Sequence, residues 1–308
     1  MKAKKDGFPK RGASPFYLVF TDLDGTLLDH DTYEWDAAVP ALRACRRRGT
    51  PVILVSSKTR SEMDILRRAL SLSDPFVSEN GGGLFFPKET FVDPPPGSVP
   101  LTDPAGETGF SKGAWAPKVG GLWKLSLGVP YPRLICALDE IRHELGWDIR
   151  GFSDMGLEEI SRLTGLGAEE ARRAAMREYD EPFIIHGNPL MEMRFLYRAA
   201  EKRGLMITSG GRFYHLQGKN DKAQAMETIA ACYRKTHTAA RVIALGDSPN
   251  DFSMLERADI PVLIRSRRNY SDLKRRIPRL RISDQVGPEG WNSVVLSILS
   301  QNGESVHE

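Results

Sequence analysis

Apolar residues along the chain fall alternately into short continuous runs and into helical spacing. The run Leu18–Phe20 predicts a buried strand, and Tyr33–Arg48, with apolar residues three and four positions apart, predicts a helix that ends at Gly49. Continuous short runs are typical of parallel strands that are buried on both faces. The next predicted elements are strand Val52–Val55, helix Ser61–Ser71 and strand Pro75–Ser78. Strands alternating with helices in this way predict a doubly wound parallel sheet.

This alternation changes after three consecutive glycines. Residues 84–86 and 90–92 predict a hairpin, and residues 94–121, rich in Pro and Gly, predict a long surface excursion. From about residue 128 to residue 216 the pattern predicts an α+β module. Its predicted helices are Pro132–Leu145, Leu157–Thr164, Ala168–Glu178 and 196–203, and its predicted strands are Phe183–Ile185 and Met191–Arg194.

The first pattern returns after this module. It predicts helix Lys222–Tyr233, strand Val242–Leu245, helix Asp251–Ala258 and strand Val262–Ile264. We therefore expect an α/β fold in which a doubly wound, Rossmann-like core spans residues 16–127 and 217–308. An α+β domain is inserted into this core at residues 128–216. Residues 1–15 are basic and lack a long apolar stretch, and they predict a disordered tail.

Composition narrows the class of protein. Of the 308 residues 41% are hydrophobic, which suffices for a globular core, and 43 basic against 40 acidic residues give a net charge of +3. We interpret the basic stretch around residues 265–281 as a solvated face, and expect no nucleic-acid partner. Without a long apolar span or closely spaced cysteines, we expect no membrane partner, no disulfide and a cytoplasmic location. Composition leaves the oligomeric state open.

Two predicted strands end in aspartates. The run Asp22-Leu23-Asp24-Gly25-Thr26 follows the first strand, and Gly246-Asp247-Ser248-Pro249-Asn250-Asp251 follows a later one. Strand ends of a doubly wound sheet lie side by side, so these carboxylates can converge on one cation. Hard oxygen ligands favour Mg²⁺, which also lets acidic residues accept a phosphate dianion. The predicted magnesium ligands are Asp22, Asp24, Asp247 and Asp251.

Simpler explanations exist for each of these aspartates. The first run is also compatible with an ordinary turn or a calcium-type loop, and Asp247 with an Asx turn or a helix cap. For Asp251, capping the next helix or orienting the site is favoured over direct ligation.

Together, these motifs resemble those of the haloacid dehalogenase superfamily of phosphohydrolases, whose first motif is Asp-x-Asp followed by Gly-Thr. The resemblance implies that Asp22 is the nucleophile and Asp24 the general acid and base, acting through an aspartyl phosphate. It also implies that the insert is an α/β cap that selects the leaving group.

Two further motifs of the superfamily have candidates in this chain. The resemblance implies that Ser56, after the second strand, holds a phosphoryl oxygen, with Ser57 as an adjacent candidate. It implies that Lys222, at a predicted helix start, neutralises the phosphoryl charge. Lys219 is the rival lysine, and Ala223 departs from the glycine that often follows the superfamily's lysine.

Several short runs in both modules resemble the mannosyl-3-phosphoglycerate phosphatases, a family within that superfamily. They include Ser56–Arg60, Glu79–Gly82, Arg177–Pro182, Gly210–His215 and Gly287–Trp291. The resemblance implies a small phosphorylated sugar substrate with an anionic glycerate, for which Lys58 and Arg212 are candidate partners. Glu79 and Asn80 are candidates for the sugar hydroxyls. The other predicted substrate-binding residues are Ser57, Gly81, Arg177 and Gly211.

These runs have ordinary interpretations as well: surface charges at Lys58 and Arg177, a turn at residues 80–81 and a hinge at residues 210–211. The leading hypothesis is a magnesium-dependent phosphatase that releases phosphate from mannosyl-3-phosphoglycerate. The alternatives are a phosphatase acting on glucosyl-3-phosphoglycerate, sucrose phosphate or another sugar phosphate, a sugar phosphomutase, and a binding protein without catalysis.

Overall fold

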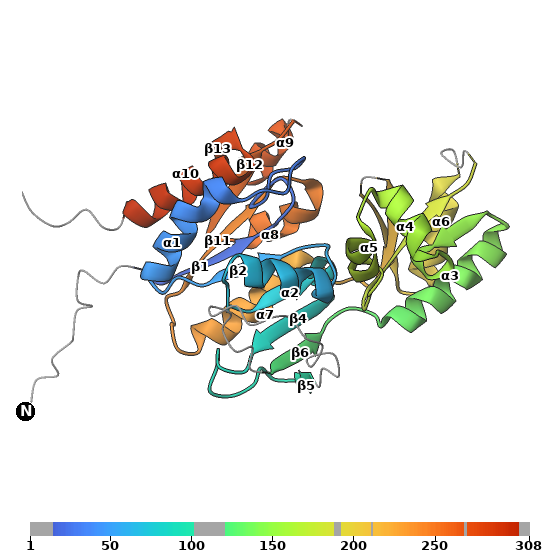
Figure 1. Ribbon diagram of the computed structural model, residues 1–308, viewed down its shortest axis with the longest axis horizontal. Coiled ribbons are helices and arrows are strands. Elements are labelled where there is room, and N and C mark those ends of the chain that lie inside the picture. The colour runs from blue at the N-terminus through green and yellow to red at the C-terminus, as the bar shows by residue number, and fades with distance from the viewer. Residues whose placement is uncertain (1–14, 102–120, 188–191, 211, 268–269, 302–308) are drawn as a thin grey trace, which may run out of the picture.

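A computed structural model of the chain describes residues 15–101, 121–187, 192–210, 212–267 and 270–301 (Figure 1). These residues form two lobes. We call the lobe built on a nine-stranded sheet the large lobe, and the lobe built on a separate four-stranded sheet the small lobe. No helix in the described residues is both long and apolar enough to cross a membrane.

The large sheet is parallel from β13 to β3 and antiparallel beyond it. Its parallel strands are fully apolar near the centre, because helices cover both faces. In order across the sheet, the strands are β13 (Arg281–Val286), β12 (Ile260–Arg265), β11 (Arg241–Gly246), β1 (Tyr17–Thr21), β2 (Val52–Val55), β3 (Phe76–Ser78), β4 (Gly83–Pro87), β6 (Leu122–Ser126) and β5 (Val99–Leu101).

Two apolar layers cover this sheet. Val19 of β1 faces the layer formed with α1 (Val39–Arg47), α2 (Arg60–Ala69) and α10 (Gly287–Ser300). Leu18 and Phe20 face the opposite layer, because successive strand residues point to opposite faces. That layer contains α7 (Lys222–Arg234), α8 (Phe252–Arg257) and α9 (Ser271–Arg276). The predicted doubly wound α/β core is therefore confirmed.

The small lobe has an antiparallel sheet with a pair of helices against each face. One face packs on α3 (Tyr131–Leu145) and α6 (Met193–Lys202). The other packs on a smaller apolar cluster with α4 (Leu157–Thr164) and α5 (Ala168–Ala174). The strand order is β7 (Ile149–Gly151), β8 (Asp180–Ile185), β10 (Phe213–Gln217) and β9 (Met206–Gly210).

Some predicted elements are wrong. The hairpin between residues 84–86 and 90–92 does not form, because β4 pairs with β3 and β6. Phe91, directly after the turn at residues 88–90, instead contacts Tyr233, with ring centroids 5.0 Å apart. The strand predicted at Met191–Arg194 is also wrong, since α6 begins at Met193 and buries its apolar face in the small lobe.

The 94–121 excursion contains strand β5 and ends beside β6, both missed by the sequence pattern. Residues 102–120 lie outside the described residues, as does all but the last residue of the predicted 1–15 tail. The helix predicted to reach Glu178 ends at Ala174.

Candidate active site

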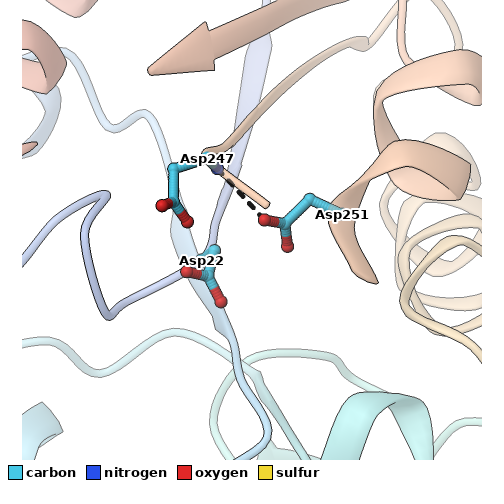
Figure 2. Close-up of side chains that lie close together, drawn as sticks. All are labelled: Asp22, Asp247 and Asp251. Carbon is cyan, nitrogen blue, oxygen red and sulfur yellow. Dashed lines mark hydrogen bonds between the residues drawn. The ribbon is translucent and has the colours of Figure 1, made fainter. Parts of the chain in front are cut away.

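Three aspartates meet at the carboxyl ends of two neighbouring strands. Asp22 follows β1 and Asp247 follows β11, which pair in parallel, and the Asp22 N–H donates to the Leu245 carbonyl at 2.9 Å. Asp251 ends a short 3₁₀ helix, η4 (Pro249–Asp251). One carboxylate oxygen from each aspartate lies within 4.8 Å of the others (Figure 2). The structure therefore brings together Asp22, Asp247 and Asp251, whereas the Asp24 carboxylate is not in this group.

Asp251 uses both of its carboxylate oxygens within the protein. Its Oδ2 accepts hydrogen bonds from the backbone N–H groups of Asp247 and Ser248, each at 3.1 Å. Its Oδ1 accepts from the Lys222 ammonium at 2.7 Å. Because both oxygens are engaged, these contacts favour an orienting role for Asp251 over direct ligation.

Lys222 connects the aspartates. Its Nζ lies 2.5 Å from Asp22 Oδ1, and the side chain is buried at the start of α7. Burial lowers the pKa of Lys222, but Asp22 and Asp251 outweigh that effect and raise it, so the lysine is charged. Lys219, the rival lysine, is exposed. The structure thus places Lys222, and not Lys219, in the site.

The charge of the three aspartates and Lys222 fits a hard divalent cation. Burial raises the pKa of Asp22 to about 8, with Asp251 adding to the effect and Lys222 opposing it. Burial also raises the pKa of Asp247 to about 6. Three carboxylates face one ammonium, so an added cation would favour their ionised forms. All the donors are oxygens, as Mg²⁺ and Ca²⁺ require.

Gly25 of the first motif allows the Asp247 carboxylate to lie close to the loop that follows β1. Its φ is +78°, and a Cβ atom there would lie 2.8 Å from Asp247 Oδ2. A side chain at this position would therefore strain the backbone and press on the Asp247 carboxylate.

Asp24 lies in a different environment. Its Oδ2 pairs with the Lys58 ammonium at 2.9 Å, and its buried Oδ1 has no hydrogen-bond partner. Ser56, buried on the loop after β2, accepts from the Lys58 N–H at 3.2 Å. The structure therefore places Ser56 and Lys58 on the β2 side of β1, opposite Asp247.

Tyr33 is a neighbour of this site that no sequence motif indicated. Its ring lies 5.3 Å from the Lys58 Nζ, and its backbone has a φ of +60°. A positive φ at an aromatic residue is the sort of feature that no local sequence pattern predicts.

Two predicted substrate-binding residues, Glu79 and Arg177, make hydrogen bonds within the protein, and we correct their assignment. The Glu79 carboxyl is fully buried and accepts backbone N–H groups of Glu178 and Tyr179, so it does not face a ligand. Arg177 is half-buried, and its Nη1 donates to the Ser57 carbonyl at 3.1 Å. Both residues join the two lobes.

The remaining candidates are spread over both lobes. Arg212 is exposed on the small lobe and donates to the Leu163 carbonyl at 2.9 Å. The Asn80 side chain accepts a hydrogen bond from the side chain of Asn250, the residue before Asp251, at 3.3 Å. Gly81 follows with a φ of +99°. Gly211 lies outside the described residues.

Comparison with known proteins points to one family. A family model described as haloacid dehalogenase-like hydrolase matches residues 19–92 and 197–269. A protein of Methanococcoides burtonii named glucosyl-3-phosphoglycerate/mannosyl-3-phosphoglycerate phosphatase is 37% identical over 288 residues, covering 93% of this chain and 98% of that protein. A protein of Persephonella marina with the same name is 34% identical over 287 residues, covering 92% and 97%.

The fold is also similar to that of solved structures. A phosphatase of the haloalkanoate (HAD) enzyme superfamily from Bacteroides thetaiotaomicron superimposes with a TM-score of 0.61 at 16% sequence identity. The match covers 97% of this chain and 99% of that one. At this identity the likeness supports the fold alone.

Proposed function

Because the chain belongs to the haloacid dehalogenase-like hydrolases and is a phosphatase, we propose that it hydrolyses mannosyl-3-phosphoglycerate to mannosylglycerate and phosphate. The names of the two relatives support this substrate and make glucosyl-3-phosphoglycerate the second candidate. The sequence runs shared with mannosyl-3-phosphoglycerate phosphatases favour the mannosyl ester.

The contrast between Asp22 and Asp24 carries the mechanism. Asp22 is buried against Lys222, whereas Asp24 is more open and pairs with Lys58. Two carboxyl groups in such different environments suit two different roles. We infer that an Asp22 oxygen attacks phosphorus, giving an aspartyl phosphate, while Asp24 donates a proton to the departing ester oxygen.

The second half-reaction uses the same two residues. Asp24, now ionised, takes a proton from water as that water attacks the aspartyl phosphate, which releases phosphate and restores Asp22. The Lys222 ammonium holds Asp22 in place and offsets the charge on the phosphoryl oxygens. Ser56 is the proposed hydrogen-bond donor to one of those oxygens.

A magnesium ion fits beside these residues. Asp22 and Asp247 would hold it, because the oxygens of Asp251 are already engaged and the Asp24 carboxylate is turned to Lys58. When bound, Mg²⁺ would neutralise the phosphate dianion and orient it for attack.

The small lobe is the proposed cap, corresponding to the predicted domain at residues 128–216. It selects the leaving group, since Asp22 and Asp24 themselves read only the phosphate. Arg212 and Lys58 remain the proposed contacts for the glycerate carboxylate.

Initial rates of phosphate release on a panel of esters test the proposal. The panel contains mannosyl-3-phosphoglycerate, glucosyl-3-phosphoglycerate, sucrose 6-phosphate and p-nitrophenyl phosphate, each assayed with Mg²⁺. We expect the highest kcat/KM on the mannosyl ester. A higher value on sucrose phosphate would contradict the assignment, and isomerised sugar phosphate without free phosphate would indicate a mutase.

A further inference from the structure

A strained turn follows strand β3. Glu79, Asn80 and Gly81, which form the 3₁₀ turn η2 (Glu79–Gly81), have φ values of +48°, +52° and +99°. The left-handed region is unfavourable for a glutamate, which has no short side chain to satisfy its own backbone. Such a conformation persists only where the surroundings hold it, and it often marks a functional position.

This turn is tied to the catalytic loops of the large lobe. The Glu79 N–H donates to the Lys58 carbonyl at 3.0 Å, and the Asn80 N–H donates to the Ser56 carbonyl at 2.9 Å. On its other side the turn touches the start of α7. A Cβ atom on Gly81 would lie 2.3 Å from the Asp221 carbonyl oxygen, one residue before Lys222. The turn therefore contacts the Ser56–Lys58 loop and also the start of α7, which carries Lys222. These two segments flank the proposed phosphate position.

Gly82, the residue after this turn, contacts the segment through which the chain first passes from the large lobe to the small lobe. The Gly82 carbonyl accepts N–H groups of Leu127 and Gly128, both at 2.9 Å, where the chain leaves the large lobe. The glycines here are packed tightly, because Cβ atoms on Gly82 and Gly128 would lie 2.4 Å and 2.8 Å from Tyr179.

The Glu79 side chain reaches the small lobe itself. Its carboxyl accepts the N–H of Glu178 at 3.1 Å and the N–H of Tyr179 at 2.7 Å. These two residues belong to the connection between α5 and β8, residues 175–179. This connection is part of the small lobe and contacts the large lobe at Glu79. Without Glu79, two adjacent backbone donors, one of them on the buried Tyr179, would lose their acceptor.

Other contacts of the α5–β8 connection lie nearer the surface. Arg60 pairs with Glu178 at 3.1 Å, and Lys124 pairs with the same carboxylate, all three side chains being partly exposed. Pairs of this kind contribute little to positioning in water. Glu79 differs because it is fully buried and because its own backbone is bonded to the loop that carries Ser56 and Lys58.

We propose that Glu79 is a positioning residue that couples the placement of the small lobe to the Ser56–Lys58 loop of the active site. Its carboxyl fixes the α5–β8 connection, and its backbone fixes the loop beside Asp24. The inference rests on the proposed function, in that a sugar phosphate is the substrate that spans both lobes. It adds a role for Glu79 in place of the predicted contact with sugar hydroxyls.

Substitution at Glu79 separates this role from simple stability. Glu79→Ala removes the acceptor, whereas Glu79→Gln keeps one oxygen that can accept both N–H groups. We expect Glu79→Ala to lower kcat/KM on mannosyl-3-phosphoglycerate by about tenfold to hundredfold, the cost of misplacing a substrate. On p-nitrophenyl phosphate, which has no sugar for the small lobe, we expect a change below about threefold.

The conservative variant and a surface control complete the experiment. Glu79→Gln should restore the sugar-phosphate activity to within about threefold of the parent chain. Glu89→Gln, at an exposed glutamate beyond β4, should change neither activity. An equal loss on both esters in Glu79→Ala, or no loss on either, would overturn the proposal.

Hydrogen exchange tests the coupling independently of the substrate. In the parent chain the Glu178 and Tyr179 amides should exchange slowly, and in Glu79→Ala they should exchange at least about tenfold faster. Rapid exchange in the parent chain would refute the coupling even where Glu79→Ala fails to fold. If the parent chain hydrolyses p-nitrophenyl phosphate but no sugar ester, the proposed substrate fails, and the exchange rates alone decide the role of Glu79.

Discussion

At the scale of single residues, two aspartates separated by one leucine have unlike surroundings. Asp22 is 6% exposed and bonded to Lys222, whereas the Asp24 side chain is 35% exposed and paired with Lys58. The motif itself places both carboxyl groups at a strand end. Their different partners come from residues far away in the chain, which is why the resemblance, and not the spacing, suggested separate roles.

Replacement of the proposed nucleophile tests the first of these roles. Asp22→Asn preserves the shape of the side chain but cannot form the aspartyl phosphate, so turnover should fall by at least about 10³-fold. Phosphate release measures the loss, and circular dichroism verifies the fold. Asp284→Asn, on the exposed side of β13, is the matched control. Appreciable turnover by a well-folded Asp22→Asn chain would rule out the mechanism.

Removal of the buried ammonium should affect both stability and activity. Lys222→Met leaves Asp22 and Asp251 without their counter-charge, which we expect to destabilise the fold by about 3 kcal/mol. Phosphate release should fall by about 10²-fold or more. Urea unfolding gives the change in free energy. Lys219→Met, at the exposed neighbouring lysine, should shift it by less than about 0.5 kcal/mol. Equal effects of the two substitutions would contradict the placement of Lys222.

Glu79 should make stability depend on pH. Burial raises its pKa from 4.5 to about 8, against the lowering effect of Arg177, while Asp180 adds to the rise. The folded state then holds a proton that the unfolded state has lost, so stability falls as the pH rises from about 5 to about 8. Glu79→Gln should lack this loss, which is on the order of a few kcal/mol. Unfolding midpoints at several pH values measure it, and parallel pH curves for both chains would refute the shift.

At the scale of elements, the buried parallel strands were predictable and the edge strands were not. Strand β2 is a continuous apolar run because helices cover both of its faces. Strand β13 is mostly exposed and polar, so it lacks that pattern. That Asp22 lies close to Asp247 was likewise predictable, because each follows the carboxyl end of a predicted parallel strand. The Glu79 contacts were not, because they depend on how the α5–β8 connection docks on the large lobe.

Helix α10 should support the site through Trp291. Trp291 is fully buried, and its indole Nε1 donates to the Thr21 hydroxyl at 3.0 Å, next to Asp22. Trp291→Phe removes that hydrogen bond and leaves a void, so it should destabilise the fold by about 1–3 kcal/mol. Thermal unfolding measures the change. Trp147→Phe, at a half-buried tryptophan of the small lobe, should cost less, and the reverse order would contradict this packing.

At the scale of the whole molecule, the cation should link activity to stability. With EDTA, phosphate release should cease, and Mg²⁺ should restore it. Because a cation that binds the folded state stabilises it, Mg²⁺ should also raise the Tm of the parent chain. Asp247→Asn should show a smaller rise. An equal rise in both chains would place the ion elsewhere.

The pairing of β1 with β11 has a consequence for how the protein is made. Asp22 and Asp247 lie in the first and last quarters of the chain, yet Thr21 and Leu245 are register partners. During synthesis β1 can pair with β2 early, but it cannot pair with β11 until the whole small lobe and β11 have left the ribosome. Contacts between such distant segments are slow to form. The catalytic centre is therefore completed late, so a truncated chain that ends before β11 can contain a folded small lobe but no active site.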